Sequence, residues 1–169
     1  MTVVKFFRRV LTAFLVVTCM FSASVASADT IEDCTARIQQ NPNDYEAYTE
    51  RGTAYFVKGL LSKTPAYYER AIQDYSKAIQ INPNYAAAYN NRGRVCLELN
   101  QYELAIQDTS KAIQLDPKSF LAYTNRGWVY YRLKQYERAL QDFNRALQIN
   151  PNNESSKKGR DACLRALGR

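Results

Sequence analysis

The chain carries the stretch AYNNRGRVCLELNQYELAIQDTSKAIQLDP at residues 88–117 and repeats it as AYTNRGWVYYRLKQYERALQDFNRALQINP at residues 122–151. The period is 34 residues, since Pro83, Pro117 and Pro151 are evenly spaced. A third, longer copy follows Pro42. A period of about 20 to 50 residues is typical of a solenoid, whose units stack because none can bury its apolar face alone. Function is therefore expected on a surface that the units share.

Each unit contains two helical runs, which we name helix A and helix B. Apolar residues recur at helical spacing on both sides of a short polar break, Asn100-Gln101 in the second copy. There the pattern predicts helix A over about 85–99 and helix B over about 102–115. Every helix B is followed by Asn-Pro or Asp-Pro, because the residue before a proline is disfavoured in a helix and proline itself lacks the N–H donor. The pattern thus predicts an all-α fold.

Small and aromatic residues recur in fixed columns of these units. In the third copy the columns are Tyr123, Gly127, Tyr130, Ala139, Phe143, Ala146 and Pro151. The first copy matches them, whereas the second carries Cys96 and Thr109 in two aromatic columns. This pattern resembles the tetratricopeptide repeat. The resemblance covers about residues 41–151 and implies an α-solenoid of three stacked helix–turn–helix repeats whose concave face binds a peptide or partner helix.

The predicted domain organisation is a signal peptide at 1–28 and a repeat domain at 29–169. Within the domain we expect an N-terminal half-repeat and a C-terminal capping helix around three repeats. Their predicted ranges are 29–40 for the half-repeat, about 42–82, 83–116 and 117–150 for the repeats, and 154–168 for the capping helix.

Residues 1–28 have the layout of a secretory signal peptide: basic residues, an apolar run at 10–21, and an Ala-x-Ala site at 26–28 before Asp29. The apolar run is short for a membrane-spanning helix. We therefore expect an exported, periplasmic or secreted protein. Two alternatives stay open, namely that the segment is retained as an anchor or that Cys19 is lipidated. Either would make the chain a membrane-anchored assembly factor of an envelope complex, and membrane association requires one of them.

The first copy is seven residues longer than the others, because 41 residues separate Pro42 from Pro83. The extra length falls within 58–67, between the two helices. Thr64-Pro65 is typical of an N-cap followed by the first helical residue, so helix B is predicted to start early and helix A to run through Leu60 or Leu61. The insertion is interpreted either as a tolerated loop or as a protruding recognition element.

An arginine precedes the column glycine in every copy, and helix B of the same copy carries an aspartate. The predicted ion pairs are Arg51–Asp74, Arg92–Asp108 and Arg126–Asp142. The planar guanidinium suits a carboxylate, and a partly buried pair fixes the register of two helices. We name this set the ladder. The alternative is a row of ligand-binding arginines.

Composition argues against an enzyme, a metal site, a cofactor site and a nucleic-acid-binding surface. The chain has no histidine, the commonest general base and metal ligand, and no phosphate-binding glycine-rich loop. The formal net charge is +7, but the basic excess lies mainly in residues 1–28 and 154–169. No catalytic residue is predicted.

Three cysteines follow residue 28, namely Cys34, Cys96 and Cys163. Each lies at or beside a core column of a different unit, so buried thiols are expected rather than a disulfide. In the last helix, Ala162, Cys163, Ala166 and Leu167 are predicted to face the core. The basic residues around them are interpreted as a polar cap or as a site for an anionic partner.

The resemblance implies that helix A lines the binding groove. The residues predicted to bind a protein or peptide partner are Thr49, Thr53, Asn90, Asn91, Arg94, Asn125, Trp128, Tyr131 and Arg132. Amides can pair with a peptide backbone, arginines with a carboxylate, and aromatic rings with an apolar side chain. Trp128 is alternatively expected to pack between repeats. Some family members bind chaperone C-termini through a clamp of Lys, Asn, Asn, Lys and Arg. The matching positions here are Thr49, Thr53, Asn91, Leu121 and Asn125, so only Asn91 agrees.

Overall fold

The computed structural model describes residues 30–169, which form eight helices and no strand. The predicted signal peptide and Cys19 lie outside the described residues. The first helix covers residues 30–40. The others are α2 (Tyr45–Ser62), α3 (Pro65–Ile81), α4 (Ala86–Glu98), α5 (Tyr102–Leu115), α6 (Phe120–Arg132), α7 (Tyr136–Ile149) and α8 (Glu154–Ala166). The predicted all-α fold is confirmed, and helix B of the second copy has the predicted bounds.

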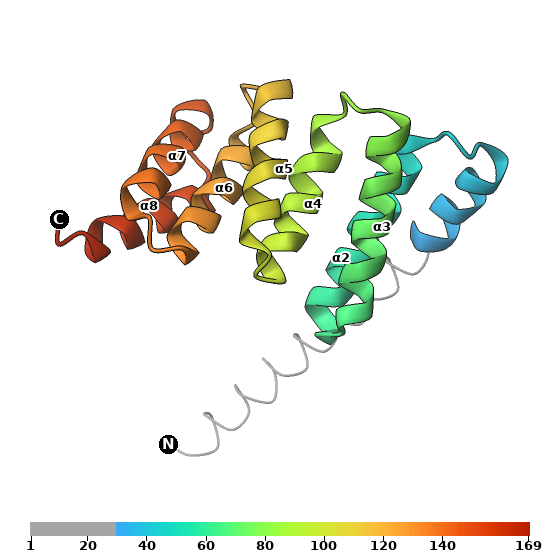
Figure 1. Ribbon diagram of the computed structural model, residues 1–169, viewed down its shortest axis with the longest axis horizontal. Coiled ribbons are helices and arrows are strands. Elements are labelled where there is room, and N and C mark those ends of the chain that lie inside the picture. Colours follow the sequence, from blue (N-terminus) through green and yellow to red (C-terminus); the bar gives the residue numbers. More distant parts are fainter. Residues whose placement is uncertain (1–29) are drawn as a thin grey trace, which may run out of the picture.

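The helices pack as a row of antiparallel pairs that runs from helix 30–40 at one end to α8 at the other (Figure 1). Each helix A contacts its own helix B and the next helix A along the row. Among residues 30–169, α3 does not contact α5, and α5 does not contact α7. Since only the A helices touch their equivalents, α2, α4, α6 and α8 line the inner side of the array.

The seven-residue insertion lengthens both helices of repeat one. Helix α2 continues to Ser62, and α3 begins at Pro65 with proline in its first turn, as predicted. These helices have 18 and 17 residues, against 13 and 14 in repeat two. The longer pair projects beyond its neighbours (Figure 1). Val57, Leu60 and Leu61 lie on this extension and are 37–41% exposed, so the insertion forms a helical hairpin with an apolar surface rather than a loop.

All three predicted ladder pairs are present as bidentate contacts. In repeat two, Nε and Nη2 of Arg92 donate to the carboxylate of Asp108 at 2.7 and 2.8 Å. The corresponding distances are 2.9 and 2.7 Å for Arg51–Asp74 and 2.8 and 2.8 Å for Arg126–Asp142. The bond to aspartate raises the pKa of each arginine. The structural interpretation of these arginines is therefore confirmed.

Each ladder arginine also contacts the preceding unit. The Nη1 atoms donate to hydroxyls one helix B earlier, at 3.0–3.2 Å, and the acceptors are Thr35, Ser76 and Ser110. One guanidinium thus joins its own helix A to two successive B helices. This geometry stabilises both the repeat and its junction with the previous repeat.

The core follows the predicted columns, and the predicted thiols are confirmed. Cys34, Cys96 and Cys163 are buried and free. Burial raises the pKa of the Cys96 thiol to about 11.

The face of α8 was predicted wrongly in part. Ala166 is exposed, and besides Cys163 the buried residues are Ser156 and Gly159. The reason is that α8 continues the helix A register. Ser156 meets the hydroxyl of Thr124 at 2.6 Å, and Gly159 leaves room for the ring of Phe143.

Candidate partner-binding groove

A cavity of about 410 Å³ opens between α4, α6 and α8 on the inner side of the array. Four of the predicted binding residues line it, namely Arg94, Trp128, Tyr131 and Arg132. Leu97, Glu98 and Ser155 complete the lining. The structure therefore brings two arginines and two aromatic side chains from successive repeats to one opening, which we name the groove cavity. Its volume is in the range that holds a small ligand or one or two side chains of a partner.

Trp128 both packs in the core and lines the groove cavity. Its ring meets Phe143 and Tyr131 edge-on, with centroids 5.2 and 5.5 Å apart. Its indole N–H donates to Ser155 Oγ at 2.9 Å. The residue is only partly buried, so the expectation of packing between repeats and the expectation of a groove residue agree. A ring held on several sides is a rigid anchor that loses little entropy on binding.

The two cavity arginines have weak internal partners. Arg94 Nε lies 3.4 Å from Glu98, and its guanidinium is 5.6 Å from the centroid of the Phe56 ring. Arg132 is exposed and donates to the side-chain oxygen of Asn100 at 2.7 Å. An exposed ion pair contributes about 0–1 kcal/mol, so exchange of these contacts for a ligand carboxylate has little cost. The groove cavity thus combines an apolar floor with a cationic rim.

The three predicted asparagines form a chain of their own outside this cavity. Asn125 Nδ2 donates to Asn90 Oδ1 at 2.8 Å, and Asn90 Nδ2 donates to Asn91 Oδ1 at 3.2 Å. Asn90 and Asn125 are 7% and 6% exposed. These amides join repeat two to repeat three, and their contact with a partner stays a prediction.

The two predicted threonines lie on α2 and do not line the groove cavity. Thr49 is buried, and its hydroxyl donates to the Tyr45 carbonyl at 2.9 Å. Thr53 is exposed, donates to the Thr49 carbonyl, and lies 3.1 Å from the hydroxyl of Tyr75. Burial raises the pKa of Tyr75 to about 12. Contact of these threonines with a partner also stays a prediction.

Two lining residues were absent from the predicted binding set although the sequence contains a signal for each. Glu98 lies four residues after Arg94, the spacing of a helical ion pair. Ser155 lies in the second column of helix A, counted into α8. Its position became evident only once α8 was seen to continue the array.

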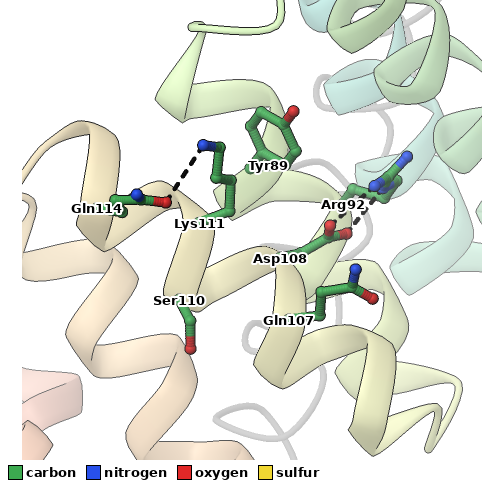
Figure 2. Close-up of a pocket in the computed structure, with 7 residues that line it drawn as sticks. All are labelled: Tyr89, Arg92, Gln107, Asp108, Ser110, Lys111 and Gln114. Atoms are coloured by element: carbon green, nitrogen blue, oxygen red, sulfur yellow. Dashed lines mark hydrogen bonds and ion pairs between the residues drawn. The ribbon is translucent and has the colours of Figure 1, made fainter.

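A second opening, of about 520 Å³, lies between α4 and α5 (Figure 2). Its charged residues are paired within the wall, because Arg92 holds Asp108 and Lys111 donates to Gln114 at 3.2 Å. Figure 2 shows these two interactions on either side of the opening. Its lining carries Tyr89 but no tryptophan and no exposed arginine pair, so the groove cavity is the better candidate site.

Comparison with known proteins agrees with this architecture. The tetratricopeptide repeat profile matches residues 86–119 and 120–153, and a related TPR repeat profile matches residues 67–98. Together these matches span more than half of the chain. The chain belongs to the tetratricopeptide repeat family. None of the curated protein sequences matches this member of the family.

Several solved structures of the family are similar to the chain. The Arabidopsis OM64 TPR domain is 30% identical, with a TM-score of 0.65 over 72% of this chain and 94% of that domain. The first TPR of Spaghetti (RPAP3), bound to the HSP90 peptide SRMEEVD, is 26% identical, with a TM-score of 0.67 over 74% and 94%. The second TPR domain of human RPAP3, in complex with the HSP70 peptide SGPTIEEVD, is 29% identical, with a TM-score of 0.61 over 69% and 91%.

The described part of this tetratricopeptide repeat protein was also searched for other kinds of site. No group of cysteine, aspartate and glutamate side chains in residues 30–169 is arranged to hold a metal ion. None of the helices in that range has the length and apolar character of a membrane span.

Proposed function

We propose that this chain is a non-enzymatic interaction scaffold that holds a segment of a partner protein in the groove cavity. The observation that carries the proposal is the convergence of Arg94, Arg132, Trp128 and Tyr131 on one opening. Solenoids present such inner surfaces to partners. Two structures similar to this chain are complexes with peptides, which supports a protein or peptide ligand.

The groove cavity favours a segment with one large apolar side chain beside a carboxylate. The aromatic rings offer an edge and a face to an apolar group, and desolvated aromatic residues commonly dominate binding energy. Arg94 and Arg132 offer planar donors to an acidic group. Glu98 in the wall disfavours a second negative charge deep in the opening.

We infer that this ligand differs from the chaperone peptides bound by the similar structures. The clamp positions carry Thr49, Thr53, Leu121 and Asn125 in place of lysine, asparagine, lysine and arginine. Thr49 and Asn125 are buried, and Asn125 is bonded to Asn90. A titration with SRMEEVD, followed by the fluorescence of Trp128, is expected to show no saturable change.

The groove assignment is tested by capture of partners from an envelope extract. Wild type is compared with the double variant Arg94→Glu, Arg132→Glu, which reverses the cationic rim without touching the core. The matched control is Lys118→Glu, Arg145→Glu, two exposed sites outside the groove cavity with the same change of charge. We expect specific partners to be lost from the groove variant and kept by the control. Identical captures by all three proteins would overturn the assignment.

We further propose that the protein is exported and works in the periplasm or as a secreted protein. The sequence layout before Asp29 supports this proposal. The alternative is a chain that stays attached to the membrane through its N-terminal segment. Intact-mass measurement of the native protein separates them, since cleavage gives a chain that starts at Asp29. A lipidated start at Cys19, or a retained N-terminus, would favour the membrane-anchored assembly factor.

A further inference from the structure

The ladder leaves one unmatched member at each end of the array. The ladder aspartates lie nine residues before the proline that follows their helix B, and Asp33 lies nine residues before Pro42. In the other direction, one period of 34 residues leads from Arg126 to Arg160. The register of the ladder thus places an aspartate in helix 30–40 and an arginine in α8.

Packing shows that these two end helices are halves of a repeat. Helix 30–40 behaves as a helix B, because Thr35 accepts from Arg51 at 3.2 Å just as Ser76 accepts from Arg92 at 3.0 Å. Helix α8 behaves as a helix A, because it contacts α6 and α7 as α6 contacts α4 and α5. The first half-repeat lacks a helix A, the last lacks a helix B, and they lie at opposite ends of the row (Figure 1).

The unmatched ladder residues are accessible. Asp33 is exposed, and no ion pair joins it to another described residue. The Arg160 side chain is 40% exposed, against 18–21% for the three ladder arginines, and its ion pair is with its chain neighbour Asp161 at 3.1 Å. Adjacent residues on a helix point in different directions, so this pair does not replace a bidentate contact across two helices.

We propose that copies of this chain associate end to end, with α8 of one copy packed against helix 30–40 of the next. The two half-repeats then complete one tetratricopeptide repeat, and Arg160 of one copy takes Asp33 of the next as its ladder partner. The contact is heterologous, so it builds open rows rather than closed dimers. The charges agree with this choice of partner, because α8 is rich in basic residues and the opposite end exposes Glu32 beside Asp33.

Apolar residues at both ends support the same register. Leu164 and Leu167 of α8 lie one period after Tyr130 and Leu133, which are partly buried against helix B in repeat three. On helix 30–40, the columns that face helix A carry Ile31 and Ile38. All four residues are partly exposed. Each end thus keeps apolar surface where a completed repeat would bury it.

The association is weaker than the contact within a repeat. One period after Gly127 the column carries Asp161, and even an added Cβ at Gly127 would lie 2.8 Å from the Phe143 ring. The two end helices therefore cannot approach as closely as α6 and α7. A loose, charge-directed contact is reversible and sensitive to ionic strength, because salt screens exposed charges over about 8 Å at physiological strength.

Sedimentation velocity of the purified full-length chain tests the proposal with a charge swap. For wild type, we expect the weight-average sedimentation coefficient to rise with concentration, and to rise more at low salt than at high salt. Asp33→Arg and Arg160→Asp, each alone, should lose this rise, because each places like charges in the junction. An equimolar mixture of the two variants should regain it, as should the double variant, because opposite charges then meet again.

The matched controls are Glu32→Arg and Lys158→Asp, which make the same changes of charge at exposed neighbours outside the ladder columns. They should lower association less than the ladder variants and show no specific recovery on mixing. Circular dichroism confirms that each variant is folded. A wild-type chain that stays monomeric at every concentration overturns the proposal, and so does association that persists equally in both single ladder variants. Neither result bears on the groove cavity, since its residues are unchanged.

Discussion

Repeats two and three share one helical frame but fill it differently. Both have helices of 13 and 14 residues, and their ladder pairs have bonds of 2.7–2.8 Å. Yet repeat two places Thr109 where repeat three places the buried ring of Phe143. In each repeat this side chain faces the column glycine. The comparison teaches that the ladder keeps the two helices in register while the filling of the core varies.

The smaller core of repeat two depends on its neighbour. Val95, Cys96 and Leu97 are all buried in α4, whereas in the same turn of α6 only Val129 is buried. Trp128 of repeat three packs against the cluster around Cys96 and also against Phe143. Repeat three therefore supplies its own ring and part of the packing of repeat two, and the ring that does so also lines the groove cavity.

The largest expected difference between the repeats concerns their central side chains. Phe143→Ala leaves a cavity and is expected to lower the free energy of unfolding by about 3–5 kcal/mol. Thr109→Ala removes one methyl group and a hydroxyl that donates to the Ala105 carbonyl at 2.6 Å, so its cost is about 1 kcal/mol. Urea unfolding followed by circular dichroism measures both. Equal costs would show that repeat two is not the less filled of the two.

Replacement of a ladder aspartate should, in contrast, affect both repeats alike. Asp108→Ala and Asp142→Ala each leave a guanidinium that is about four-fifths buried without its carboxylate. We expect a loss near the lower end of the roughly 3–5 kcal/mol for a broken buried pair, together with reduced cooperativity. Partner capture by the folded fraction should be unchanged. Loss of capture without loss of stability would instead make the ladder a ligand-binding row.

The sequence was sufficient to predict the repeat architecture, the lengthened first hairpin and the ladder, because each depends on residues at a constant spacing. Arg92 and Asp108 recur together in every copy, so their contact follows from the period alone. The asparagine chain could not be predicted, since Asn90, Asn91 and Asn125 are equally suited to a peptide backbone or to one another. The face of α8 was missed because its apolar residues alone do not show that Ser156 and Gly159 occupy buried columns.

Alkaline pH should distinguish repeat one from repeat three, which share the central column but differ in its titratable group. The pKa of Tyr75 is raised by burial to about 12 in the folded protein and is about 10 in the unfolded chain. The unfolded state releases this proton first, so stability falls between about pH 10 and 12, by on the order of 2 kcal/mol. Phe143 has no such proton.

The variant Tyr75→Phe isolates this effect from the other tyrosines. Its free energy of unfolding should be slightly lower than that of wild type at neutral pH, because the contact with Thr53 is lost. The gap should close or reverse as the pH rises past 10. Parallel pH profiles for the two proteins would mean that the Tyr75 hydroxyl is not shielded from water.

The smallest effect is expected at the hydroxyls that join one repeat to the next. Ser110→Ala removes the acceptor that Arg126 Nη1 meets at 3.1 Å, while the bidentate bond of Arg126 to Asp142 remains. The expected loss is about 0.5–1 kcal/mol, the net value of one hydrogen bond. In a double-mutant cycle with Asp142→Ala the two losses should not add, because both act through the same guanidinium. Full additivity would mean that the junction between repeats two and three is held by apolar contacts alone, and that the ladder acts only within each repeat.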